Sequence, residues 1–143
     1  MNSLNQKYVY WFFSAIAILL AGFLSYKSVN SNYILSDPLG TAITSEQIIT
    51  NGTIRLDAYG KTLSKYGERV HQKGDHAYYY FPLGTPLLIT PIVAAYKAAH
   101  VNIQKNEVRI QKTAIAITSA ITLFLLIYLA GYFVPKAASI LST

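Results

Sequence analysis

Two uncharged, apolar stretches lie near the two ends of the chain, and a polar segment separates them. Residues 8–26 and 113–134 contain no Asp, Glu, Lys or Arg. A helix over the first stretch is about 28 Å long at a rise of 1.5 Å per residue, which is close to the thickness of the hydrocarbon core of a bilayer. The pattern predicts two transmembrane helices, at residues 8–26 and 113–134, and the second is expected to end before Pro135 and Lys136.

The first stretch has a second interpretation, which is a cleaved signal peptide. Its apolar run is longer than the roughly 7–15 residues of an ordinary signal-peptide core. Tyr8, Tyr10 and Trp11 form an aromatic group of the kind found at membrane interfaces, and residues 25–28 make a poor cleavage site. These features favour an uncleaved signal anchor.

The first half of the polar segment contains signals for a turn, a helix and a strand. Residues 36–40 read as a turn, and Thr44 with Gln47 has the spacing of a capping box at the start of a helix. Gly52, which follows an asparagine, is typical of the left-handed residue after a helix. Residues 53–57 then alternate like a short strand.

The second half of the polar segment predicts a β-hairpin and a further helix. Residues 69–72 and 76–81 flank Lys73-Gly74-Asp75, which is hairpin spacing. Thr85 as N-cap and Pro86 at the first helical position predict a juxtamembrane helix over 86–100, kinked at Pro91. Its apolar run is too short for a full span and suits the membrane interface. A third crossing at 83–99 is the alternative.

The expected fold is therefore a mainly α membrane protein, in which two transmembrane helices are joined by an α+β loop with a short hairpin and a juxtamembrane helix. The expected regions are an N-terminus over 1–7, the loop over 27–112 and a short tail over 135–143. Lysine and arginine lie near both ends of the spans. Because the positive-inside rule weakens for long loops, these residues alone leave the orientation open.

Composition narrows the possible partners. The chain has no cysteine, which excludes a disulfide framework, a thiolate nucleophile and a cysteine metal site. Its net charge of +6 comes from bases scattered among acids rather than gathered on one face. We therefore expect a lipid bilayer, and not a nucleic acid, as the partner of these charges.

Histidine and tyrosine provide two candidate binding groups in the hairpin. His71 and His76 on facing strands could bind a divalent metal together with Asp75, but two histidines without a third ligand in register are more often plain polar positions, so no cofactor is expected. The aromatic run 78–81 has two interpretations. It forms a stacking platform for a sugar or a nucleobase, or it packs at the membrane interface.

Asp37 is the candidate catalytic residue. It lies about ten residues beyond the first apolar stretch, beside the turn-forming Pro38 and Gly40. A carboxylate near lipid head groups is partly desolvated and can serve as a general base. An aspartate that only initiates a turn is the alternative.

The order of two segments carries a resemblance to a known family. SDPLGTAITSEQIITNGTIRLDAY covers residues 36–59, and KGDHAYYYFPLGTPLLITPIV covers residues 73–93. Together with the flanking spans, they resemble the N-terminal portion of bacterial polytopic membrane glycosyltransferases of the GT-C class, relatives of the protein mannosyltransferases and aminoarabinose transferases. The matching residues are Thr44, Ile48, Gly52, Thr53, Leu56 and Asp57 in the first segment, and Gly74, Tyr78, Phe81, Pro82, Gly84, Pro86, Leu87, Leu88 and Pro91 in the second.

The resemblance implies a bacterial plasma-membrane protein with a cytoplasmic N-terminus and an extracytoplasmic loop over 27–112. It also implies a polyprenyl-phosphate sugar donor, with Asp37 as the base that activates an acceptor hydroxyl. Members of this class have many more spans and bind the donor phosphate largely through later loops. The chain is therefore expected to be the first-loop portion, inactive without a missing C-terminal remainder as its partner. The alternative is a small two-span membrane protein whose loop binds a partner or ligand without catalysis.

Overall fold

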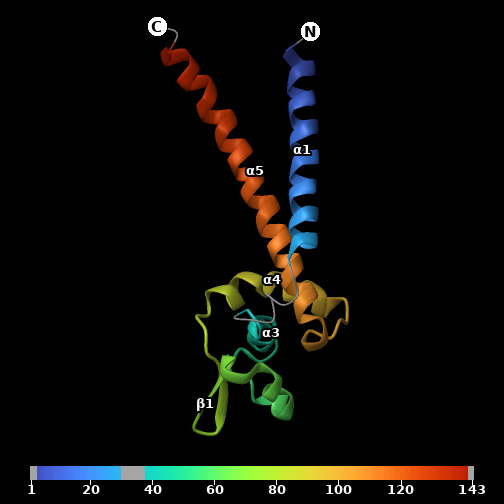
Figure 1. Ribbon diagram of the computed structural model, residues 1–143, viewed down its shortest axis with the longest axis vertical. Coiled ribbons are helices and arrows are strands. Elements are labelled where there is room, and N and C mark those ends of the chain that lie inside the picture. The colour runs from blue at the N-terminus through green and yellow to red at the C-terminus, as the bar shows by residue number, and fades with distance from the viewer. Residues whose placement is uncertain (1–2, 30–37, 142–143) are drawn as a thin grey trace. The chain divides into compact units, whose positions relative to one another are not determined.

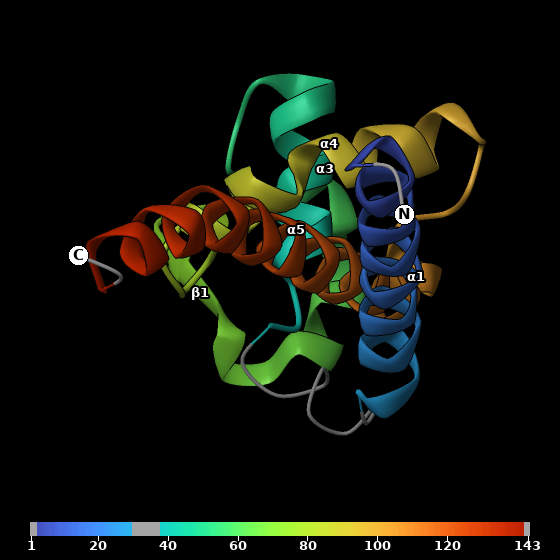
Figure 2. The same cartoon turned by 90° about the horizontal axis from the view of Figure 1, so that it is seen from above.

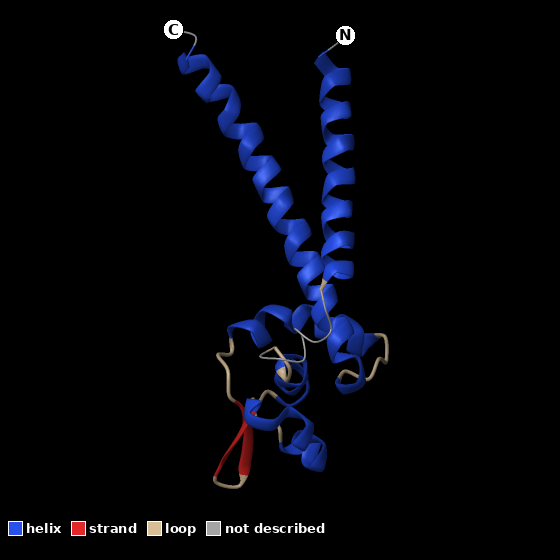
Figure 3. Cartoon of the chain, viewed as in Figure 1, coloured by secondary structure: helices blue, strands red, loops and turns tan. Residues whose placement is uncertain are grey.

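The computed structural model describes the backbone of residues 3–29 and 38–141 and the side chains of residues 8–29 and 38–133. The protein is mostly helical, with one two-stranded sheet (Figures 1 and 3). It forms two compact units. One is the helix pair, residues 1–28 with 115–143, and the other is the loop domain, residues 29–114.

In the helix pair, small residues allow α1 (Ser3–Ser28) to approach α5 (Glu107–Leu141). A Cβ atom on Gly22 would lie 3.4 Å from the carbonyl oxygen of Ala116 and 3.6 Å from the Cβ of Ala120. The hydroxyl of Tyr10 donates a hydrogen bond to the carbonyl of Ile127 at 3.3 Å. Close approach through small residues is typical of helices that pack in a lipid environment.

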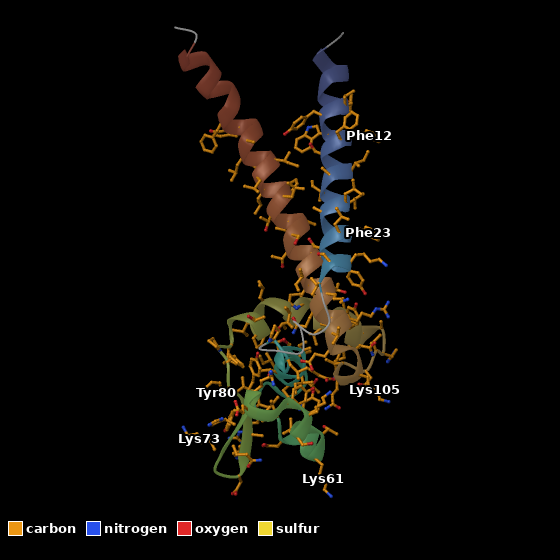
Figure 4. The ribbon with its side chains drawn as sticks, in the orientation of Figure 1. Phe12, Phe23, Lys61, Lys73, Tyr80 and Lys105 are labelled. Carbon is orange, nitrogen blue, oxygen red and sulfur yellow. The ribbon has the colours of Figure 1, made fainter. Side chains whose placement is uncertain are left out.

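Both helices of the pair are long and apolar enough to cross a membrane. Their qualifying segments are Tyr8–Ser28 and Gln104–Phe133, with mean hydropathies of 1.8 and 2.2, and only 6% of each apolar stretch is buried. Aromatic and aliphatic side chains such as Phe12, Phe23 and Leu126 are more than half exposed (Figure 4). The predicted pair of long apolar helices is confirmed.

The predicted end of the second helix is wrong, because α5 continues through Pro135 to Leu141. Proline removes only one backbone hydrogen bond, and a helix can continue past it with its remaining bonds intact. The helix also begins at Glu107, six residues before the apolar stretch.

The loop domain is built around two packed helices. Its α4 (Gly84–Ala98) packs across α3 (Thr41–Asn51), as Figure 2 shows, and both contact the start of α5 through an apolar core. The 3-10 turn η2 (Gln104–Asn106) leads into α5. The core consists of Ala42, Ile89, Val93, Ile103, Ile110 and Ala114, with Ile92 and Tyr96 packed against it.

The predicted hairpin is confirmed. Strand β1 (Val70–Lys73) pairs with β2 (His76–Tyr79) in antiparallel register through a turn at Gly74, whose φ is 62°. The predicted strand over 53–57 is reduced to one bridge, between Arg55 and Tyr78. The chain then enters a series of 3-10 turns, η1 (Asp57–Arg69), broken at its two glycines. A second core forms here from Leu39, Ile43, Leu56, Tyr66, Ala77 and Tyr79.

Helix α3 begins one turn earlier than the capping-box pattern predicts. Its first residue is Thr41, and Gly40 takes the N-cap position with φ 106°. Thr44 is buried inside the helix, where its hydroxyl donates to the carbonyl of Gly40 at 2.8 Å. Gly52 ends the helix with φ 61°, as predicted.

Helix α4 also begins earlier than predicted, at Gly84, so that Thr85 lies inside it rather than at its N-cap. Fifteen residues give a length of about 22 Å, which is too short to cross the hydrocarbon core. Among the described residues, α4 is not one of the helices that could span, so the alternative of a third crossing at 83–99 finds no support. Leu87 and Leu88 on its outer face are 56% and 70% exposed.

Substitution of the two glycines that flank α3 tests whether Gly40 packs closely against the Tyr79 ring. Both have positive φ, but a Cβ on Gly40 would lie 2.9 Å from the Tyr79 ring, whereas one on Gly52 would meet nothing within 4 Å. Gly52→Ala should therefore cost only about 1–2 kcal/mol of unfolding free energy for the left-handed backbone. Gly40→Ala should cost about 1–3 kcal/mol more, because the ring must move. Thermal unfolding in detergent micelles would measure both, and equal costs would contradict the packing described.

Candidate functional site

The candidate base, Asp37, lies outside the described residues, and the structure instead defines the turn that follows it. The carbonyl of Pro38 accepts hydrogen bonds from the amide of Thr41 at 3.1 Å and from the Thr41 hydroxyl at 2.7 Å. The side-chain amide of Gln111 donates to the same carbonyl at 3.2 Å and also to the Thr41 hydroxyl. Four contacts therefore fix the residues immediately after Asp37.

Glu107 at the start of α5 caps the N-terminus of α3. Its side chain is buried, and its Oε1 atom accepts hydrogen bonds from the amides of Gly40 at 2.6 Å and Ala42 at 3.3 Å. Its Oε2 atom accepts a hydrogen bond from the Tyr66 hydroxyl at 3.0 Å. A carboxylate at a helix N-terminus satisfies free amides and interacts favourably with the helix dipole. Glu107 thus accepts hydrogen bonds from the free amides of α3, which is the role of an N-cap side chain, although it is distant from α3 in the sequence.

The electrostatics of this group are set mainly by burial. Removal from water raises the pKa of Glu107 above its ordinary value of 4.5, and the hydrogen bonds from Gly40, Tyr66 and Ala42 oppose that rise. Burial, with the nearby Glu107 charge second, also raises the pKa of Tyr66, so its hydroxyl keeps its proton and remains a donor. Among the main causes of this pKa shift, Lys65 is the one basic residue, and its positive charge lowers the pKa of Glu107. The carboxylate is therefore held by dipoles rather than by an ion pair.

A cavity lies next to this turn. Its volume is about 290 Å³, near the lower end for small-molecule sites. Its lining is mostly apolar and consists of Pro38, Thr41, Tyr79, Phe81, Pro82, Gly84 and Thr85. The first two residues come from the segment that contains Asp37, and the others come from the segment around the start of α4. The two sequence segments that carry the family resemblance therefore meet at one cavity.

The first turn of α4 forms one wall of this cavity. Gly84 and Thr85 are its lining residues there, and the N-terminal end of a helix carries a partial positive charge. Such an end favours an anion such as a phosphate. The cavity thus combines a mostly apolar surface with a helix end that favours negative charge.

The other acidic residues of the described core have structural partners. Glu46 accepts hydrogen bonds from the Tyr59 hydroxyl at 2.6 Å and from the Lys97 ammonium at 3.3 Å. Asp57 accepts a hydrogen bond from the amide of Ala77 at 2.8 Å and contacts the imidazole of His76 at 2.7 Å. The Ala77 amide first and His76 second lower the pKa of Asp57 below its ordinary value of 3.8. Asp57 therefore attaches the hairpin to η1.

The candidate metal group is not assembled as the hairpin spacing suggested. The register pairs His71 with Tyr78 and His76 with Lys73, so the two histidines are not opposite each other. His76 contacts Asp57, while the His71 ring lies 5.1 Å from the Tyr80 ring between centroids. The described residues contain no group of three or more metal-ligating side chains.

Sequence reasoning missed Glu107 and Gln111, which hold the candidate site together. One signal for Glu107 was present, because it is the only acid after Asp75 and lies among Lys105, Arg109 and Lys112. Its partners are 41 to 67 residues away along the chain, and no local pattern connects residues so distant.

No family model matches this chain, and neither a curated protein nor a solved structure matches it.

Glu107 should give the loop domain a distinctive dependence on pH. Because its pKa is raised in the folded state, the folded chain binds more protons than the unfolded chain from pH 4.5 up to that raised pKa. The stability of the wild type relative to Glu107→Gln should therefore fall as pH rises through this window and then become constant. The glutamine keeps a carbonyl acceptor for the two amides. Thermal unfolding at a series of pH values would measure the difference.

Asp57→Asn is the matched control with the opposite sign. The lowered pKa of Asp57 means that its contribution to stability is present above pH 3.8 and is lost as pH falls through the folded-state value. If the difference in stability between the wild type and Glu107→Gln stays constant from pH 4 to 8, the Glu107 carboxyl is not desolvated as described.

Proposed function

We propose that this chain is the first-loop portion of a GT-C-like membrane glycosyltransferase, which moves a sugar from a polyprenyl-phosphate donor to an acceptor outside the cytoplasm. The observation that carries the proposal is the cavity shared by the two resemblance segments. Pro38 lines it and is joined directly to Asp37, and Thr85 lines it from the start of α4. The residue that follows the candidate base in the sequence and the first turn of α4 thus line the same cavity.

The membrane arrangement is part of the proposal. Residues 8–26 and 113–134 span the plasma membrane of a bacterium, residues 1–7 and 135–143 are cytoplasmic, and residues 27–112 lie outside. The exposure of most apolar side chains on both helices supports the two spans, since such surfaces are unfavourable in water. Glu107 lies outside the second span, six residues before its uncharged stretch.

Helix α4 lies at the membrane interface in this proposal. One face packs on the loop-domain core through Ile89 and Val93, and the other exposes Leu87 and Leu88. A helix with one packed side and one exposed apolar side can bury its exposed side among lipid head groups and upper acyl chains. The cavity at its N-terminal end then lies at the depth where a lipid-linked phosphate resides.

The chemistry follows from this placement. The acceptor hydroxyl attacks the anomeric carbon of the donor sugar, Asp37 takes the hydroxyl proton, and the bond from the anomeric carbon to the phosphate oxygen breaks. Polyprenyl phosphate leaves with the bonding electron pair. The positive end of α4 stabilises the negative charge that develops on this leaving group. Further donor-phosphate contacts come from the C-terminal remainder of the enzyme.

The Asp37→Asn variant tests the proposed chemistry. Asparagine keeps the shape of the side chain but cannot accept the proton, so transfer should fall by about 10²–10⁴. Membrane insertion should be unchanged. The assay measures transfer of radiolabelled sugar from polyprenyl phosphate in membranes that contain the protein as its gene encodes it.

Asp57→Asn is the control for this assay, because Asp57 attaches the hairpin and does not line the cavity. Its loss should reduce the amount of folded protein, while transfer per folded molecule stays near normal. Absence of transfer in the wild type, or near-normal transfer by Asp37→Asn, would contradict the proposed role. A loop that binds a partner without catalysis would then be the better account.

A further inference from the structure

A second cavity lies beside the first and differs from it in chemistry. Its volume is about 400 Å³, and its lining contains two charged side chains and two aromatic rings. The lining residues are Gly67, Glu68, Arg69, Tyr80 and Phe81. Phe81 also lines the first cavity, so one aromatic side chain forms a wall of both.

The fold holds the parts of this second cavity in fixed register. The amide of Tyr80 donates a hydrogen bond to the carbonyl of Arg69 at 2.9 Å, which continues the hairpin ladder one pair beyond Val70 and Tyr79. Gly67 has φ 55°, a backbone conformation that breaks η1 two residues before its end and turns the chain toward β1. Glu68 and Arg69 are thereby brought beside the aromatic residues that follow β2.

Tyr80 presents an aromatic surface supported by two neighbouring rings. It is 63% exposed, although a tyrosine ring is a large apolar surface to leave in water. Its centroid lies 5.1 Å from the His71 ring and 5.6 Å from the Phe81 ring, the latter edge to face. Figure 4 shows Tyr80 at the side of the loop domain where β2 leads toward α4. The ring is therefore positioned by contacts and still open to a ligand.

The charged side chains favour an uncharged ligand that donates hydrogen bonds. Glu68 has no hydrogen bond or ion pair among the described residues, so its carboxylate is available as an acceptor. Arg69 carries a guanidinium group that contacts the carbonyl of Tyr66 at 3.4 Å and has a further interaction besides this one. One negative and one positive group leave the lining without net charge. An anion is disfavoured by Glu68 and a cation by Arg69.

We propose that this second cavity binds an uncharged saccharide. The C–H groups on one face of a sugar ring carry partial positive charge and pack on the electron-rich face of Tyr80. Its hydroxyls donate to the Glu68 carboxylate, whose charge is balanced by the positive charge of Arg69. A flat aromatic ligand would use the ring but would leave the carboxylate without a donor. Saccharide binding stands on this cavity alone.

The assignment of this saccharide as the acceptor rests on the proposed function. Phe81 separates the two cavities, so a sugar on Tyr80 lies next to the donor cavity and to the turn that follows Asp37. The acceptor is then a glycan whose hydroxyl reaches past Phe81 toward the donor.

The test measures glycan binding without any donor. The chain in nanodiscs of uncharged lipid is applied to a printed array of uncharged oligosaccharides, and the strongest ligand is titrated by saturation-transfer NMR. Tyr80→Ala should weaken binding about two- to tenfold, the size expected for one aromatic contact, and Glu68→Gln should weaken it about tenfold, the size expected for one charge-assisted hydrogen bond. Tyr80→Phe keeps the ring and should bind like the wild type. Asp75→Asn, at the hairpin turn outside the cavity, should also bind normally.

Because Tyr80 is exposed and Glu68 has no partner among the described residues, these variants should unfold at the wild-type temperature. Failure of every oligosaccharide to bind, or undiminished affinity in both Tyr80→Ala and Glu68→Gln, would overturn the proposal. Binding that is lost in these variants, together with no sugar transfer in membranes that contain the protein as its gene encodes it, would support the saccharide cavity and contradict the glycosyltransferase proposal. The two proposals can therefore fail separately.

Discussion

The hydrogen bonds accepted by the Glu107 carboxylate are the contacts on which the loop domain depends, because they join three segments that are distant in sequence. The carboxylate binds the amides of Gly40 and Ala42 at the start of α3 and the hydroxyl of Tyr66 in η1. A buried carboxylate is costly without such partners. Here the helix end and the tyrosine supply the hydrogen bonds that water would otherwise make. Glu107 begins α5, whose first residues belong to the loop domain.

The position of both cavities follows from this contact. With Gly40 held by Glu107, a ring can pack directly against the glycine, and the ring that does so is that of Tyr79. Tyr79 is the last residue of β2, so the chain beyond it passes the turn at Pro38 before α4 begins. Phe81 then lies between an apolar cavity with a helix end and a polar cavity lined by one acidic and one basic residue. In the proposed enzyme, this difference in lining separates a lipid-linked donor from an uncharged acceptor.

Features encoded by neighbouring residues could be predicted from the sequence, and features set by distant contacts could not. The hairpin at Gly74, the end of α3 at Gly52 and the two long apolar helices all depend on local chemistry, and the structure contains them. The capping-box pattern predicts a helix start at Thr44, whereas the cap of α3 is a carboxylate 67 residues from Gly40 along the chain. For the candidate site, the sequence identified both segments that line the cavity. It did not identify Glu107 or Gln111, which fix them.

The central claim, that a lipid-linked sugar occupies the cavity lined by Pro38 and Thr85, is tested most directly by thiol protection at Thr85. The chain has no cysteine, so Thr85→Cys introduces a single thiol in the cavity wall, and Ser64→Cys introduces one at an exposed position outside that cavity. In intact cells, a membrane-impermeant maleimide should label both variants. In proteoliposomes, polyprenyl-phosphate sugar should slow the labelling of Thr85→Cys about tenfold when nine-tenths of the sites are filled, and it should leave Ser64→Cys unaffected. Labelling of Ser64→Cys only after the cells are broken, or equal labelling of Thr85→Cys with and without the donor, would contradict the account.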